Sequence, residues 1–223
     1  MVRVLVIADE VAPSLNDSTL RDLSPELVLS AGDLPWDYVE WVAYAAKCPA
    51  VFVPGNHDPE IKRTRLTRRG GYMSHGMPCP PPRPCGVVNA DMNVVEAAGL
   101  RIAGLGGCVR YRSGPHQYTQ RQYAYRSWRL MRRARSAGPV DVLLTHAPPL
   151  GLGDAADRPH VGIESLHGVL DQLQPTWHLH GHIHPYGQRL PDRQVGQTTI
   201  RNVIPWKVLD ITAKSSRPAV RTA

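Results

Sequence analysis

Four of the ten histidines in this chain lie within seven residues, at His178, His180, His182 and His184. Imidazole is a common metal ligand because it coordinates while neutral near pH 7. Gly181 precedes the last two of these histidines, and a glycine there allows a tight turn that brings both rings to one cavity. A surface cluster of histidines is the alternative interpretation. The spacing favours a metal site, since the run directly follows a short hydrophobic segment.

Several other short apolar runs, of the kind expected for buried strands, also end in polar side chains. Their alternation with helical patterns predicts a parallel sheet, in which ligands bind beyond the carboxyl ends of the strands. One polar strand end is ordinary, but several in succession indicate a site. Together with the histidine run, the side chains at these ends are Asp9, Asp33, Asn56, His57, His146, His182 and His184.

The chemistry of this set is that of a divalent metal site. Its members supply carboxylate, amide and imidazole groups, which suit manganese, iron, zinc or nickel better than copper or an iron–sulfur cluster. The four cysteines show no CxxC spacing, so a thiolate site is not predicted. Two metals roughly 3.5–4 Å apart can hold the attacking and leaving oxygens of a phosphoryl displacement. Asp33 is the natural carboxylate to bridge such a pair.

The order of these groups resembles the calcineurin-like metallophosphoesterases, whose motifs DxH, GD, GNH[DE], H and GHxH stand at successive strand ends. The resemblance covers roughly residues 5 to 185, and the segment from Gly104 to Thr119 resembles a bacterial subgroup of the family. It implies an α/β fold, a four-layer α/β/β/α sandwich with mixed sheets and the metals at the strand carboxyl ends. We expect residues 1–223 to form a single metallophosphoesterase domain. The matching blocks are Asp9-Glu10-Val11, Gly32-Asp33, Gly55-Asn56-His57-Asp58, His146 and Gly181-His182-Ile183-His184.

The resemblance also implies a role for each group. Two divalent metals are expected, with manganese first and iron, zinc or nickel as alternatives. A metal-bridging hydroxide would attack phosphorus in line with the leaving group. His57 and Asp33 would be the catalytic residues, with His57 supporting the transition state or protonating the leaving alkoxide. The first metal would be held by Asp9, Asp33 and His184, and the second by Asp33, Asn56, His146 and His182.

The first block departs from the family pattern, because Val11 stands where the motif has a histidine. A valine side chain cannot coordinate a metal, so the first site should lose a ligand. Glu10 is adjacent, but along a strand its side chain would point the other way. Water, Glu10 or the loop residue His160 are candidates for the open position. We expect a dinuclear centre with a weakened first site; a changed metal preference or a mononuclear centre are the alternatives.

Arg110 and His160 are the predicted substrate contacts. Arginine recognises phosphate in a planar, bidentate manner, and His160 lies in a loop where a lid residue is possible. An exposed arginine and a surface-loop histidine are equally compatible with the sequence. Cys79 and Cys85 bracket a proline-rich loop, where free thiols are favoured over a disulfide.

A basic helix is predicted from Thr119, where Thr119 and Gln122 form a capping box. Its inner face is expected to carry Ala124, Trp128 and Met131, with its arginines, including Arg126, in solvent. The whole chain has 26 Lys and Arg against 19 Asp and Glu, a formal charge of +7. This charge favours anionic partners without identifying them. No groove-reading motif accompanies the helix, so nucleic acid is not the favoured partner.

We therefore predict a metal-dependent phosphoesterase, with phosphodiesters preferred over monoesters and a phosphorylated small molecule or nucleotide as substrate. A scaffold of the same fold that has lost catalysis is the main alternative, and a nuclease is a minor one. The chain has no apolar run of membrane-spanning length and no signal-peptide cleavage pattern. It is expected to be cytoplasmic. The sequence does not predict an oligomeric state.

Overall fold

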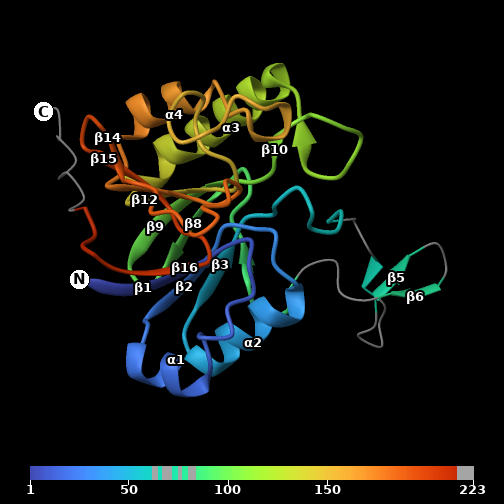
Figure 1. Cartoon of the computed structure of the whole chain (residues 1–223), viewed down its shortest axis with the longest axis vertical. Helices are drawn as coiled ribbons and strands as arrows, with labels where there is room; N and C mark the ends of the chain where they lie inside the picture. Colours follow the sequence, from blue (N-terminus) through green and yellow to red (C-terminus); the bar gives the residue numbers. More distant parts are fainter. Residues whose placement is uncertain (62–64, 67–71, 75–76, 80–83, 215–223) are drawn as a thin grey trace, which may run out of the picture.

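The computed structural model describes residues 1–61, 65–66, 72–74, 77–79 and 84–214. Two large β-sheets face each other, and a pair of helices covers the outer face of each (Figure 1). These four layers confirm the α/β/β/α sandwich with mixed sheets that the sequence predicted. The side chain of Cys79 lies outside the described residues, so the prediction on its pairing with Cys85 stays a prediction.

The first sheet has the strand order β16-β1-β2-β3-β7. Its strands are parallel except for β16, which pairs antiparallel with β1. Two helices, α1 and α2, cover its outer face. The elements of this half are β1 (Val2–Ile7), α1 (Asp17–Leu23), β2 (Leu27–Ser30), α2 (Trp36–Ala46), β3 (Ala50–Phe52), β7 (Val88–Asn89) and β16 (Trp206–Ile211).

The second sheet has the strand order β14-β15-β13-β12-β9-β8, with antiparallel strands at both edges. Its outer face is covered by α3 and α4. The turn predicted at residues 98–99 connects the antiparallel pair at one edge. The elements of this half are β8 (Val94–Ala97), β9 (Leu100–Leu105), α3 (Gln120–Ala137), β12 (Val142–Thr145), α4 (Leu166–Leu173), β13 (Trp177–His180), β14 (Arg193–Val195) and β15 (Thr198–Asn202).

The remaining elements are short. Three strands form a small separate sheet, two more pair in parallel near the second sheet, and one 3-10 helix lies in the loop before α4. None of the helices in the described part of the chain is both long and apolar enough to cross a membrane. The short elements are β4 (Arg65–Leu66), β5 (Tyr72–Ser74), β6 (Met77–Cys79), β10 (Cys108–Val109), β11 (Gln117–Tyr118) and η1 (Arg158–His160).

The core is divided into three layers by the alternation of side chains along each strand. In β1, Val4 and Val6 face the second sheet, whereas Leu5 and Ile7 face α1 and α2. Successive side chains of a strand point to opposite faces, so a strand covered on both sides reads as a continuous apolar run. The polar residue that follows such a run lies beyond the carboxyl end of the strand, outside the core. This is why the strand ends are available for chemistry.

The helix α3 begins as predicted but buries a different face. Thr119 and Gln122 form the expected capping box. However, Trp128 is exposed, and Arg126 is buried instead. The Arg126 guanidinium donates to both oxygens of Asp91, at 2.7 and 2.9 Å, and stacks over Tyr118. The predicted inner face was therefore wrong for Ala124 and Trp128, although Met131 does pack against the core. Arg126 can be buried because a carboxylate on a distant loop pairs with its charge.

Candidate metal centre

The predicted ligands come together at one end of the sandwich, where the carboxyl ends of the parallel strands of both sheets lie. They lie within four residues after the ends of β1, β2, β3, β12 and β13. Ligand atoms of Asp33, His146 and His182 lie within 4.8 Å of one another, a group able to hold a metal ion. The Nε2 atom of His146 lies 3.3 Å from Asp33 Oδ2 and 3.0 Å from Asn56 Oδ1. The two sheets thus contribute donors to one small volume.

Three of the predicted ligands adopt the left-handed backbone conformation, with φ of 62° at Asp9, 56° at Asp33 and 67° at His182. This conformation is unfavourable for residues with a side chain, so surrounding contacts must hold it. The carboxylate of Asp9 accepts hydrogen bonds from the His182 N–H, at 3.1 and 3.0 Å. Asp33 Oδ1 accepts from the His57 N–H at 2.7 Å. The loops that carry the ligands therefore brace one another across the strand ends.

Two glycines of the site are required by space. A Cβ atom at Gly55 would lie 2.0 Å from Asp33 Oδ1, and one at Gly181 would lie 2.1 Å from Asp9 Oδ2. Any side chain at either position would displace a carboxylate. Gly181 was expected to provide a tight turn, but the left-handed residue of this segment is His182. A glycine is instead required at position 181 because the backbone there lies very close to the Asp9 carboxylate.

Each of three histidines has one ring nitrogen held by an oxygen atom outside the cluster. The Nδ1 of His146 lies 2.8 Å from the carbonyl of Ala31, and the Nε2 of His182 lies 3.0 Å from the carbonyl of Pro159. A carbonyl accepts only from an N–H, so the opposite nitrogen keeps its lone pair for a metal. The Nδ1 of His184 is 2.9 Å from Glu10 Oε1, and its Nε2 is 3.9 Å from Asp9 Oδ1. Such outer partners fix the tautomer and orientation of metal-bound histidines.

The charges of the cluster attract a cation. Burial raises the pKa of Asp9 to about 6. Burial opposes ionisation of Asp33 as well, but the positive charge and hydrogen bond of His146 lower the pKa of Asp33 to about 2. Burial likewise opposes protonation of His146, yet Asp33 raises the pKa of His146 to about 10. A proton on His146 thus offsets one of the two carboxylates, and a divalent metal would replace that proton. The donors present fit a metal ion.

Two sides of this centre differ in their surroundings. We call Asp33, Asn56, His146 and His182 the buried side, and Asp9, Glu10, Val11 and His184 the open side. The Val11 side chain is 51% exposed. Glu10 was expected to point away as well, but its carboxylate contacts His184. The strand β1 ends at Ile7 and Asp9 turns the chain, so strand alternation no longer applies at Glu10.

His57 is exposed beside Asp33. Its side chain lines a cavity of about 450 Å³ together with Asp33, Asp37 and Asp58. The carboxylate of Asp58 accepts hydrogen bonds from the Gly55 N–H at 2.7 Å and the Asp33 N–H at 3.2 Å. Asp58 therefore braces the loop that presents His57, rather than capping a helix. The open cavity leaves the imidazole of His57 accessible to a substrate.

The two predicted substrate contacts are placed differently. The ring of His160 lies 5.4 Å from that of His182, next to the cluster, and its Nδ1 is held by Asp157. The guanidinium of Arg110 instead contacts the Gln117 carbonyl and the Gln122 side chain. Substrate contact by either residue stays a prediction. The carbonyls of Ala31 and Pro159 were not anticipated, since a backbone acceptor has no signature in the sequence.

Known proteins share both sequence and fold with this chain. A family model described as calcineurin-like phosphoesterase matches residues 3–186. UPF0046 protein T07D4.2 of Caenorhabditis elegans is 36% identical over 94 residues, which cover 41% of this chain and 22% of that protein. The chain thus spans about a fifth of the length of this relative.

Solved structures agree on the fold. TT1561 of Thermus thermophilus superposes with a TM-score of 0.55 at 13% identity, covering 89% of this chain and 87% of that chain. A second structure superposes with a TM-score of 0.60 at 12% identity, covering 90% and 89%. At such identities the likeness shows the fold alone. Because the family model covers well over half of its length, this chain belongs to the calcineurin-like phosphoesterase family, whose members depend on metal ions.

Proposed function

We propose that this protein is a phosphodiesterase that uses two divalent metal ions, manganese first among them. The proposal builds on the metal-dependent phosphoesterase activity that the family and the metal-binding group support. The observation that carries it is the convergence of Asp33, His146 and His182, whose ligand atoms lie within 4.8 Å of one another. The substrate class is a phosphorylated small molecule or nucleotide.

The predicted ligands form two sets, one for each metal ion. On the buried side, Asn56, His146 and His182 would hold one ion, and on the open side Asp9 and His184 would hold the other. Asp33, on the buried side, would be the carboxylate shared by both ions. When bound, the metals would activate water and neutralise the charge on the phosphoryl oxygens.

His57 would serve the leaving group. Its imidazole is exposed in the cavity beside Asp33, while its backbone N–H is fixed by the Asp33 carboxylate. An imidazole so placed can donate a proton to a departing alkoxide, and general acids of this kind typically contribute about 100- to 10,000-fold to rate.

A catalytically inactive scaffold of the same fold is the second candidate. The observation in its favour is Val11, which provides no donor at the position of a family ligand. In that case the loops around the strand ends would serve a binding partner. Metal content separates the two candidates, because a scaffold has no need of either ion.

The test combines metal analysis with hydrolysis of bis(p-nitrophenyl) phosphate by protein purified without a tag, with added Mn²⁺. We expect bound metal and turnover. Because p-nitrophenolate leaves without a proton, the effect of His57→Ala is measured on a dinucleotide diester, whose leaving alkoxide needs one, and kcat for that diester should fall at least about 100-fold. His167→Ala is the matched control, because His167 lies on α4, where its Nε2 contacts the Leu150 carbonyl. Absence of metal together with absence of turnover on diesters and monoesters would favour the scaffold.

A further inference from the structure

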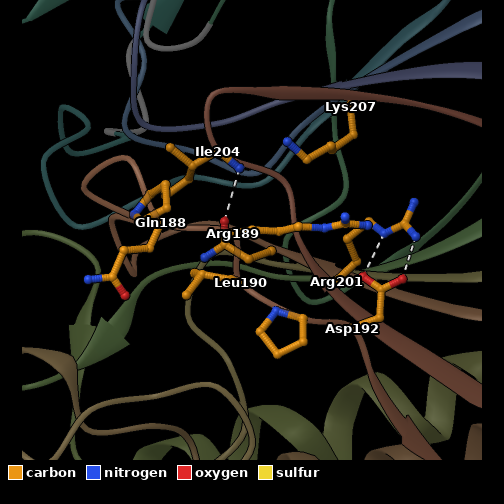
Figure 2. A pocket seen from close by; sticks show the side chains of 10 residues that line it. Gln188, Arg189, Leu190, Asp192, Arg201, Ile204 and Lys207 are labelled. Atoms are coloured by element: carbon orange, nitrogen blue, oxygen red, sulfur yellow. Dashed lines mark hydrogen bonds and ion pairs between the residues drawn. The ribbon is translucent and has the colours of Figure 1, made fainter.

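A second cavity lies beside the candidate metal centre and has a basic lining. Its volume is about 640 Å³, and its charged lining residues are Arg189, Asp192, Arg201 and Lys207 (Figure 2). We call these four residues and the space between them the basic pocket. Leu190 and Ile204 add apolar surface to the wall. This volume falls within the range of about 300–1,000 Å³ typical of small-molecule sites.

The basic pocket carries an excess of positive charge. Asp192 is its one carboxylate among the described lining residues, and the Arg201 guanidinium holds both of its oxygens. Arg201 is also stacked over Trp177, at 4.8 Å from the ring centroid. Arg189 and Lys207 therefore have no carboxylate of their own within the described lining. Burial and the nearby charge of Arg201 lower the pKa of Lys207. A bound anion would relieve this repulsion.

The basic pocket adjoins the open side of the metal centre. Pro185 lines it and follows His184 directly in the chain. Asn202, another lining residue, donates to the carbonyl of Ile183 at 2.8 Å. Lys207 projects from β16, where it pairs with Val6 of β1, the strand that leads to Asp9. The wall of the pocket is therefore attached to the same strand ends that present the predicted ligands.

We propose that the basic pocket binds a second anionic group of the substrate, a phosphate or a carboxylate, while the scissile phosphodiester lies at the metal centre. The inference rests on the proposed phosphodiesterase function. Arg189 and Lys207 supply the charge that binds this group, and the Arg201–Asp192 pair positions the wall. The apolar surface of Leu190 and Ile204 accommodates the organic part that joins the two anionic groups. The substrate is thus a diester with an additional negative charge on one arm.

Anion binding is tested first, by calorimetric titration of the metal-free full chain with inorganic pyrophosphate. Loss of one charge-assisted hydrogen bond raises the dissociation constant at least about tenfold. We expect Kd for pyrophosphate to rise by that factor in Arg189→Gln, in Lys207→Gln and more in the double variant. The control is Arg21→Gln/Arg135→Gln, which removes the same charge from exposed positions on α1 and α3. An unchanged Kd in the double variant would overturn the proposal.

The substrate role is tested with a matched pair of diesters. The p-nitrophenyl ester of thymidine 5′-phosphate and its 3′-phosphorylated counterpart differ by one anionic group. We expect kcat/KM to favour the 3′-phosphorylated ester about tenfold or more, and this ratio to fall toward one in Arg189→Gln/Lys207→Gln but not in the control.

Three results would contradict the substrate role, each in a different way. Turnover of both esters without a preference would reject the inference and leave the phosphodiesterase function standing. Pyrophosphate binding that depends on the pair, without any change in the ester ratio, would identify a site for a free anion instead. No turnover of these esters or of bis(p-nitrophenyl) phosphate would reject the proposed function, and the substrate role with it.

Discussion

The buried side and the open side of the metal centre both contain an aspartate and at least one histidine, but their histidines are held in different ways. The rings of His146 and His182 are buried and fixed by backbone carbonyls. The side chains of His184 and Glu10 are 35% and 48% exposed, and the histidine Nδ1 is held by the Glu10 carboxylate rather than by a backbone carbonyl. A donor that a rigid loop orients before binding loses little freedom when the metal arrives, whereas an exposed pair must first be ordered.

The position of Val11 lies on the open side, where the family motif has a histidine. The missing histidine ligand therefore belongs to the side whose histidine and glutamate side chains are more exposed. On the buried side every predicted ligand is retained, and three of them make direct contacts with one another. We expect the two metals to bind with clearly different affinities, the buried side more tightly. Three substitutions test this difference, in order of decreasing effect, and a fourth, with the smallest effect, tests burial of a histidine that is not a predicted ligand.

Asp33→Asn should have the largest effect, because Asp33 belongs to the buried side and its charge also acts on Asp9. Loss of this carboxylate removes charge from both metal positions, so kcat/KM for bis(p-nitrophenyl) phosphate should fall at least about a thousandfold. Circular dichroism would establish that the variant is folded. Asp171→Asn, at an exposed position on α4, is the control. Activity within tenfold of the native protein would show that Asp33 is not shared by two metals.

Val11→His should have the next largest effect, by adding a donor to the open side. Even outer partners of metal ligands are worth about 10- to 100-fold in affinity, and a direct ligand should give at least about tenfold. Calorimetric titration with Mn²⁺ should show two events in the native protein, with only the weaker one tightened in the variant. Val11→Leu is the matched control without a donor. If both events tighten equally, the two sides are not independent.

Much of this centre was predictable because each ligand follows an apolar run. The strand that ends before Asp9, the one before Asp33 and the one before His146 are all visible as short hydrophobic segments. Parallel strands bring their carboxyl ends to one edge, so linear order was enough to predict proximity. The four-layer arrangement, in contrast, came from the family resemblance, since periodicity alone does not decide how two sheets pack.

The features that were missed depend on contacts between distant segments. The orientation of Glu10 follows from the left-handed φ of Asp9, which the residue type does not reveal. The buried face of α3 depends on Asp91, which lies 35 residues before Arg126. The basic pocket brings together Arg189 and Lys207, and neither belongs to a motif. Local sequence could not supply these partners, because tertiary packing selects them.

Glu10→Gln should have a smaller effect that is confined to the open side. The Glu10 carboxylate lies 2.9 Å from the Nδ1 of His184, so its charge supports the nitrogen that faces Asp9. Loss of that charge should raise the Kd of the weaker Mn²⁺ site about tenfold and leave the Kd of the tighter site unchanged. Glu10→Asp should restore part of the affinity if its shorter carboxylate reaches the ring. Glu96→Gln, at an exposed carboxylate on β8, is the control. Direct ligation by Glu10 would instead appear as a much larger loss.

The histidine run shows the same division between buried and open residues. His178 is fully buried in β13, where its Nε2 lies 2.8 Å from the hydroxyl of Thr145. Its Nδ1 is buried and has no hydrogen-bond partner among the described residues. Burial and the nearby His180 lower the pKa of His178 well below its ordinary value. His178 therefore tests burial without being a predicted metal ligand.

His178→Gln should have the smallest effect, seen in the pH dependence of stability. The unfolded chain binds a proton at this histidine below about pH 6.5, whereas the folded protein rejects it, so stability is lost as pH falls. Between pH 7.5 and 6.0 one such histidine lowers the free energy of unfolding by about 0.8 kcal/mol, and the variant should lack that share. Urea unfolding in the presence of a chelator measures the free energy of unfolding at both pH values, and His167→Gln is the control. An equal loss in native protein and variant would mean that His178 is protonated in the fold, and burial would not set the acid sensitivity of this strand.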